Sequence, residues 1–214
     1  MFDLPTTRED WVIRIMTLVS LIASLTIHEF AHAKAADYLG DDTPRRQGRV
    51  TLNPVAHLDP IGTIGLFVIV LAGFGFGWGK PVITNPLNYS KASMRVGSWW
   101  VTAAGPLSNL VVAIVCALLI RFHAFDFDPT FTLRWAGITM AVNLGLFFFN
   151  LLPVPPLDGS KLILPLFNNR TADHLQQQYM VWGIFPMLAL LMLRIPQMVL
   201  PPLITGFATF LLGY

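Results

Sequence analysis

Two histidines and a glutamate in the segment SLTIHEFAHAKA, residues 24–35, have the spacing of a metal-dependent hydrolytic site. His28 and His32 are four residues apart, so on a helix both imidazoles lie on one face and can bind the same metal ion. Glu29 follows His28 directly and can reach a water molecule on that metal. The metal lowers the pKa of the water and the glutamate takes its proton. The pattern therefore predicts a zinc centre that activates water.

The third protein ligand must come from elsewhere in the chain, because catalytic zinc sites normally use three and keep the fourth position open. Asp158 is one candidate, in the segment FNLLPVPPLDGSK, residues 149–161. The prolines of this segment cannot continue a helix, so the chain must unwind before Asp158 and present its carboxylate from non-helical backbone. The rival candidates are His57, Asp59, His123, Asp126 and Asp128.

The composition is that of an integral membrane protein. Of the 214 residues, 54% are hydrophobic and 12% are charged, whereas soluble domains carry about 25% charged residues. The net charge of +2 and the lack of a Lys/Arg cluster in the sequence exclude nucleic acid as a partner. The single cysteine, Cys116, cannot form an internal disulfide and is expected to be a core or lipid-facing residue. We predict an all-α polytopic fold embedded in a lipid bilayer.

Four apolar runs are long enough to cross a hydrocarbon core of about 30 Å, which takes about 20 helical residues. They cover residues 11–38, 96–120, 135–152 and 179–193. The first three lie within residues 11–165. The tail, 197–214, predicts a short further helix or a segment at the membrane interface. We expect a single domain over residues 1–214, with a C-terminal helical hairpin or interfacial segment at roughly 175–214.

A further apolar run, residues 61–78, is rich in glycine, which argues against a plain spanning helix. If this run is re-entrant, nine Lys and Arg residues fall on one side of the membrane and four on the other, with Arg194 left over; if it crosses, the split is six to seven. Because Lys and Arg concentrate on the cytoplasmic side, the re-entrant path is preferred. The stretch FGFGWGKPVITNP, residues 74–86, predicts an extended, strand-like segment between the first two core helices.

These motifs resemble those of the site-2 protease family, the intramembrane zinc metalloproteases. HEFAH, residues 28–32, is similar to the first family motif, and NLLPVPPLDG, residues 150–159, to the second, with Asp158 in the ligand position. AAGPLSN, residues 103–109, is similar to the G-P-x-x-N element of the family's middle core helix. The similarity covers roughly residues 15–165.

The resemblance implies a three-helix core that buries zinc near the cytosolic face of a bacterial-type cell membrane. It implies that the substrates are transmembrane segments of other proteins, usually cut after a first protease has trimmed them. No polar region of the sequence exceeds about twenty residues, so we expect a short bacterial-type member without a PDZ-like or CBS-like domain. How such a chain selects its substrates stays open at this point.

The motifs together predict a mechanism. His28, His32 and Asp158 would hold Zn²⁺. Glu29 would take a proton from water during attack on a peptide carbonyl and deliver it to the leaving amine.

Four further residues are expected to support the substrate. Asn150 or Asn109 would donate a hydrogen bond to the oxyanion or to the substrate backbone, with hydrogen bonding between helices as the alternative role. A helical substrate must be unwound before it is cut. The extended stretch that contains Gly77 and Gly79 offers an edge to which the unwound substrate can add as a strand.

Two other classes of function are consistent with parts of the sequence. A membrane zinc-binding protein without proteolysis, such as a degenerate homologue, would keep the ligands but would not need Glu29. A small transporter or channel with a His/Asp metal path would place ionisable residues at several depths of the bundle, and the runs at 96–120 and 179–193 have none in their interiors. The intact Glu29 favours the protease.

Overall fold

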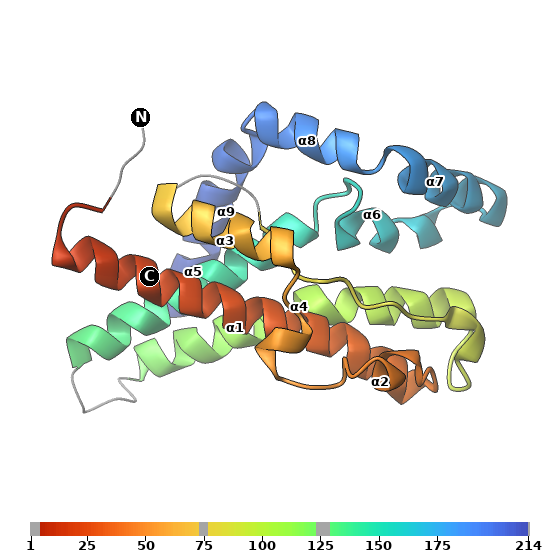
Figure 1. Ribbon diagram of the computed structural model, residues 1–214, viewed down its shortest axis with the longest axis horizontal. Helices are drawn as coiled ribbons and strands as arrows, with labels where there is room; N and C mark the ends of the chain where they lie inside the picture. The colour runs from red at the N-terminus through yellow and green to blue at the C-terminus, as the bar shows by residue number, and fades with distance from the viewer. Residues whose placement is uncertain (1–4, 73–76, 123–128, 214) are drawn as a thin grey trace.

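Helices account for nearly all regular structure in the residues that the computed structural model describes, which are 5–72, 77–122 and 129–213. Within these ranges, the one β contact is an isolated bridge between Leu58 and Gly79. The all-α prediction is confirmed. The α-helices, shown in Figure 1, are α1 (Arg8–Leu39), α2 (Thr43–Arg46), α3 (Pro60–Ala72), α4 (Met94–Arg121), α5 (Pro129–Asn150), α6 (Asp158–Leu162), α7 (Asn169–Trp182), α8 (Ile184–Met192) and α9 (Ile195–Leu212).

Among the described residues, four helices are long and apolar enough to cross a membrane, namely α1, α4, α5 and α9. The first three correspond to the predicted runs at 11–38, 96–120 and 135–152. The long helix α1 begins at a capping box in which Thr7 and Asp10 bond each other's backbone N–H groups, and it ends at Gly40 in the left-handed conformation. The chain is a polytopic α-helical membrane protein, as predicted.

The prediction of a membrane span over residues 179–193 is wrong. The chain bends at Gly183, which separates the end of α7 from α8, and α8 has nine residues, a length of about 14 Å. A Cβ on Gly183 would lie 3.1 Å from the Cβ of Pro155, so this position packs closely against the segment before Asp158. The fourth helix of spanning length is instead α9, in the tail, and it follows Arg194 in the left-handed conformation.

The segment between α1 and α4 leaves the bundle and returns to the place where it left. Leu58 and Gly79 form an antiparallel bridge, and the N–H of Lys80 donates to the carbonyl of His57 at 2.7 Å. Within the described residues, helix α3 has 13 residues, a length of about 20 Å, which is shorter than the roughly 30 Å of hydrocarbon that a spanning helix crosses. Paired ends and a short helix agree with the predicted re-entrant path.

The predicted conformation of that segment is only partly correct. Residues 60–72 form helix α3, and the extended backbone is confined to the part after it, of which residues 77–85 are described. Asp59 starts the helix by accepting from the N–H of Gly62 at 2.8 Å. Glycine is needed at position 62 because a Cβ there would overlap the carbonyl of Trp78. Gly62 therefore allows α3 and the backbone of Trp78 to approach closely, and it does not break the helix.

The core lies where α1, α4 and α5 pack against one another, with α9 against α4 and α5. Small side chains let the helices approach closely, as is usual in membrane bundles. Cys116 is buried in this core, as expected from the sequence. The central cluster consists of Ala113, Cys116, Ala117, Met140 and Leu144.

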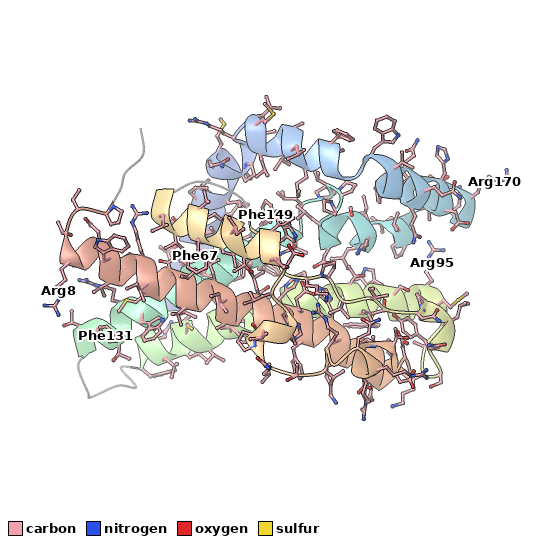
Figure 2. The ribbon with its side chains drawn as sticks, viewed as in Figure 1. Arg8, Phe67, Arg95, Phe131, Phe149 and Arg170 are labelled. Carbon is pink, nitrogen blue, oxygen red and sulfur yellow. The ribbon has the colours of Figure 1, made fainter. Side chains whose placement is uncertain are left out.

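The two ends of the bundle carry different groups. Figure 2 places Arg95 and Arg170 at one end of the long axis and Arg8 at the other. Near Arg8, Arg134 pairs with Glu9 at 2.6 Å. This separation agrees with the two sets of basic residues that the re-entrant topology predicts.

Candidate metal centre

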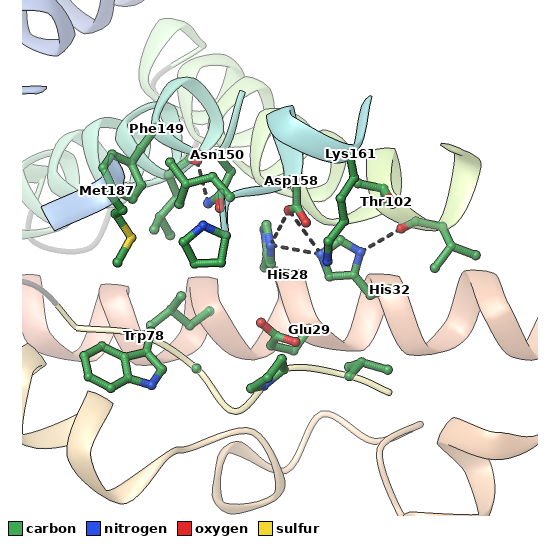
Figure 3. Close-up of a pocket in the computed structure, with 18 of the residues that line it drawn as sticks. His28, Glu29, His32, Trp78, Thr102, Phe149, Asn150, Asp158, Lys161 and Met187 are labelled. Atoms are coloured by element: carbon green, nitrogen blue, oxygen red, sulfur yellow. Dashed lines mark hydrogen bonds and ion pairs between the residues drawn. The ribbon is translucent and has the colours of Figure 1, made fainter. Parts of the chain in front are cut away.

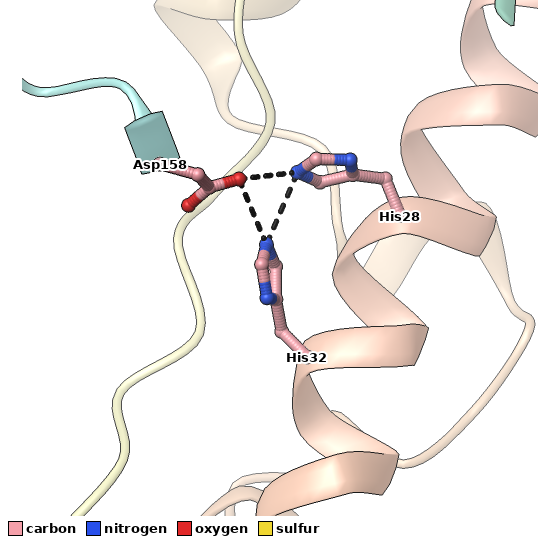
Figure 4. Close-up of side chains that lie close together, drawn as sticks. All are labelled: His28, His32 and Asp158. Carbon is pink, nitrogen blue, oxygen red and sulfur yellow. Dashed lines mark hydrogen bonds and ion pairs between the residues drawn. The ribbon is translucent and has the colours of Figure 1, made fainter. Parts of the chain in front are cut away.

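His28, His32 and Asp158 converge on one point inside the helix bundle (Figure 4). Their facing atoms are the two histidine Nε2 atoms, 3.1 Å apart, and Asp158 Oδ2, which lies 3.2 Å from His28 and 3.3 Å from His32. His28 is 4% exposed. Asp158 is the candidate third ligand that the structure brings to the histidine pair.

The rival candidates are placed elsewhere. His57 is buried and its Nε2 lies 2.7 Å from the carbonyl of Thr51, while Asp59 begins α3. The three other rivals lie outside the described residues: His123, Asp126 and Asp128.

The three converging atoms are all acceptors. The Nδ1 of His32 lies 2.7 Å from the carbonyl oxygen of Val101, which can only accept, so the ring hydrogen is on Nδ1 and Nε2 presents a lone pair. The Nδ1 of His28 lies 2.7 Å from Oδ1 of Asn109, which accepts its hydrogen and leaves a lone pair on Nε2. Asp158 Oδ2 is buried without a hydrogen-bond donor among the described residues. Three acceptors at such distances repel one another unless a cation lies between them.

The spacing of the three atoms fits a tetrahedral metal. Nitrogen and oxygen ligands lie about 2.0–2.2 Å from zinc, which places two ligand atoms of a tetrahedron about 3.3 Å apart. The observed separations are 3.1, 3.2 and 3.3 Å. The residues therefore fit a metal held by three protein ligands with one position left open.

The segment before Asp158 is shaped to present its carboxylate. Helix α5 ends at Asn150, and the proline-rich turn that follows leads to α6, whose first residue is Asp158. Ser160 donates to the carbonyl of Leu157 at 2.7 Å and so fixes the start of α6. A Cβ on Gly159 would overlap the backbone of Leu151, so only glycine allows the turn to fold this closely onto the end of α5. The prolines thus unwind the chain where the sequence predicted.

Helix α4 covers the histidines from the other side. A Cβ on Gly105 would overlap His32 Nε2 and would lie 2.7 Å from Cε1 of His28. Glycine is thus required there for α4 to approach the ligands, a role that the sequence reasoning missed. The signal was present in the GPLSN motif, which begins with Gly105. The same helix supplies the Val101 carbonyl and Asn109, the partners of the two Nδ1 atoms.

Glu29 lies on the side of α1 that faces the extended segment 77–85 (Figure 3). A Cβ on Gly79 would lie 3.4 Å from Oε1 of Glu29, so the carboxylate lies beside this glycine. Glu29 is 9% exposed and lines the same cavity as the three ligands. The carboxylate is thus placed between the metal centre and the extended segment.

Arg49 joins the two ends of the re-entrant segment. Its guanidinium donates to the carbonyl of Ala56, before the segment, and to that of Lys80, after it. Burial lowers the pKa of Arg49, and the negative charge of Glu29 opposes that shift. The sequence reasoning did not single out Arg49, because a contact with two distant carbonyls leaves no local pattern.

The cavity beside the metal centre has a volume of about 420 Å³, within the usual range of ligand pockets. Gly77 and Gly79 line it, and so does Asn150, whose Nδ2 donates to the carbonyl of Leu146 at 2.9 Å. Lys161 and Met187 also line it, as Figure 3 shows.

Asn109 is placed differently from the expected substrate contact. It has no exposed surface, and its amide bonds His28, Asn143 and the carbonyl of Ser24. Asn109 therefore holds a metal ligand and links helices, which is the alternative role that the sequence left open.

Comparisons with known proteins agree with this site. A sequence model described as peptidase family M50 matches residues 123–194. Because the chain also has substantial identity to relatives described as zinc metalloproteases, it belongs to this family, which confirms the resemblance to the site-2 proteases. No solved structure matches the chain significantly.

Two of these relatives are bacterial. "Putative zinc metalloprotease YwhC" of Bacillus subtilis is 43% identical over 152 residues, covering 68% of this chain and 66% of the relative. Rip2 of Mycolicibacterium smegmatis, described in the same words, is 32% identical over 179 residues, covering 83% of this chain and 66% of the relative. The chain thus spans just under two thirds of the length of each.

Proposed function

We propose that this protein is an intramembrane zinc metalloprotease that hydrolyses peptide bonds within or near transmembrane segments of other proteins. The observation that carries the proposal is the convergence of three acceptor atoms from His28, His32 and Asp158, with Glu29 beside them at a cavity inside a bundle of membrane-spanning helices. Membership of peptidase family M50 supports the same activity.

The residues would divide the reaction among them. Zinc, when bound by the two histidines and the aspartate, supplies an acidified water and an electrophile for the carbonyl oxygen. Glu29 takes the proton as the nucleophile attacks, and it later passes that proton to the leaving amine. Asn150 lies at the cavity wall, where a rotated amide would donate to the substrate backbone or to the developing oxyanion.

The substrate would bind as an added strand along residues 77–85. This stretch is extended and lines the cavity with Gly77, Trp78 and Gly79. A transmembrane helix hides its peptide bonds, so it must unwind, and pairing with an existing extended segment replaces the hydrogen bonds that unwinding breaks. Since Glu29 lies beside Gly79, a peptide on this edge would lie next to the general base.

We propose further that the active site opens towards the cytosolic side of a bacterial cell membrane. The supporting observation is the position of Arg95 and Arg170 at one end of the bundle (Figure 2), which belongs to the more basic side of the re-entrant topology. Cysteine-accessibility labelling of a Cys116→Ser protein with a new cysteine at Lys91 tests this. Labelling from the external side in intact cells would reverse the orientation.

The activity is tested with purified full-length protein loaded with zinc and reconstituted with a bacterial membrane-protein extract. New termini are mapped by mass spectrometry and compared with those from Glu29→Gln protein. We expect new termini within transmembrane segments in the wild-type sample alone. Equal termini in both samples, with one zinc bound per chain in each, would assign the chain to non-proteolytic zinc binding.

A further inference from the structure

A second layer of buried amides lies behind His28, on the side away from the cavity. Asn109 on α4 and Asn143 on α5 both have no exposed surface. Asn109 Nδ2 donates to Asn143 Oδ1 at 2.9 Å and to the carbonyl of Ser24 at 3.3 Å. Asn143 Nδ2 donates to the hydroxyl of Ser24 and to the carbonyl of Thr139, both at 2.8 Å. These contacts connect the three core helices directly behind a metal ligand.

Two backbone carbonyls, those of Thr139 and Ser24, fix the direction of each hydrogen bond in this chain. The carbonyl of Thr139 can only accept, so the NH₂ end of the Asn143 amide must face it, and the oxygen must face Asn109. That oxygen, at 2.9 Å, and the carbonyl of Ser24, at 3.3 Å, both take the NH₂ end of Asn109, which leaves Asn109 Oδ1 facing Nδ1 of His28 at 2.7 Å. The hydrogen of His28 is then on Nδ1, and Nε2 presents its lone pair to the metal.

We propose that Asn143 is a positioning residue for the metal centre, which selects the metal-binding tautomer of His28 through Asn109. Asn143 does not touch the cavity and carries no part of the reaction itself. Outer partners of this kind typically contribute 10- to 100-fold to metal affinity. The proposal rests on the zinc site of the proposed function and does not depend on proteolysis.

His32 provides a contrast within the same site. Its Nδ1 lies 2.7 Å from the backbone carbonyl of Val101, which can only accept a hydrogen bond. No side-chain amide stands between His32 and a fixed acceptor, so its tautomer needs no relay. The effect of Asn143 should therefore be confined to His28.

The competing explanation is that Asn143 only holds helices together. Ser20 on α1 and Thr139 on α5 have that role one helical turn away. Ser20 Oγ and Thr139 Oγ1 lie 2.9 Å apart, and Trp135 Nε1 donates to Ser20 at 3.2 Å. Ser20 is four residues before Ser24, as Thr139 is before Asn143. Ser20→Ala thus removes a buried polar contact between α1 and α5 without touching the amide relay.

The first experiment measures the zinc Kd of purified protein by competition with a chromophoric chelator. Asn143→Leu keeps the side-chain volume close and should weaken zinc binding about 10- to 100-fold, whereas Ser20→Ala should leave the Kd unchanged. The Asn109→Leu/Asn143→Leu double variant should bind zinc no more weakly than Asn109→Leu alone, because Asn143 acts through Asn109. Wild-type affinity in Asn143→Leu, or additive losses in the double variant, would overturn the proposal.

A second measurement needs no substitution at Asn143. In metal-free wild-type protein labelled with ¹⁵N-histidine, His28 is assigned by the signals lost in His28→Gln. We expect a hydrogen on Nδ1, and an Nδ1 without a hydrogen would refute the relay even if Asn143→Leu failed to fold. Absence of zinc binding in folded wild-type protein would refute the proposed function as well, so the two failures are distinguishable.

Discussion

The wall of the cavity that holds the metal ligands consists of packed helices, whereas the wall facing it is extended backbone tied down near its ends. On the first wall, the rings of His28 and His32 are each fixed by a hydrogen bond from Nδ1 to α4. On the second, Lys80 is bound to His57 and Arg49, and Asn85 is bound to Asp41. Metal chemistry needs fixed side chains, while a peptide of varied sequence is best met by backbone.

This comparison predicts that changes on the helical wall affect the metal, and that changes on the extended wall affect cleavage with the metal still bound. Two readouts separate the walls, namely zinc per chain and the rate of substrate cleavage. A change on the extended wall that lowers the zinc content would show that the two walls are coupled.

Asp158→Ala should have the largest effect, because it removes one of three ligands from the helical side. Zinc content should fall from near one per chain to very little, and cleavage should be lost with it. Metal analysis of detergent-solubilised protein checks this. Full zinc occupancy without Asp158 would remove it from the ligand set and reopen the search for the third ligand.

Glu29 lies between the two walls, so Glu29→Gln should change the cleavage rate and leave the zinc content unchanged. Zinc should stay near one per chain, since the carboxylate is not one of the converging atoms. Cleavage should fall about 10²- to 10⁴-fold, the usual contribution of a general base. A rate close to wild type would assign proton transfer to another group.

Gly77→Ala should disturb the extended wall alone. A Cβ there would lie 2.6 Å from the backbone nitrogen of Leu66, so the segment must move away from α3. A displacement of about 1 Å can cost about 100-fold in rate, and zinc content should not change. Gly137→Ala is the control, because nothing lies within 4 Å of that position. Equal rates for the two variants would contradict a positioned substrate strand.

Arg49→Met should loosen the base of the same wall. The substitution leaves the carbonyls of Ala56 and Lys80 without their donor, at a cost of about 1–3 kcal/mol for a buried group. We expect faster proteolytic nicking after the re-entrant segment and a raised KM, with zinc affinity unchanged. Arg45→Met is the control, since Arg45 is exposed and forms its ion pair with Asp37 on α1, away from the carbonyls of Ala56 and Lys80. Weakened zinc binding in Arg49→Met would place Arg49 on the metal side.

Asp41 should give the smallest effect, and one that depends on pH. Burial by itself would raise its pKa, but hydrogen bonds from Thr43, Asn85 and Asn88 outweigh it and hold the pKa below the ordinary value. Its stabilising contribution is therefore complete above the unfolded-state pKa of about 4 and is lost as the pH falls through the lower folded-state value.

Thermal unfolding in detergent checks the Asp41 prediction. Asp41→Asn should lower the stability at pH 7 by about 1–3 kcal/mol and should reduce the loss of stability on acidification. Asp42→Asn is the control, because Asp42 is exposed and forms a surface ion pair with Arg46. An unchanged acid profile in Asp41→Asn would contradict the assignment.

The sequence by itself determined the chemistry, because its signals are local. The spacing of His28 and His32 places both rings on one helix face, and the prolines before Asp158 force the chain to unwind there. Long apolar runs fixed the class of fold, since only a helix or a closed barrel satisfies the backbone in lipid. The family motifs were read correctly for the same reason.

Only the tertiary structure decided the features that depend on contacts between distant segments. It packed Gly183 against Pro155 where α7 meets α8, and it made residues 60–72 a helix. It also turned Asn109 towards His28. Such roles depend on what a side chain meets across the bundle, and the residues on either side of it in the sequence do not carry that information.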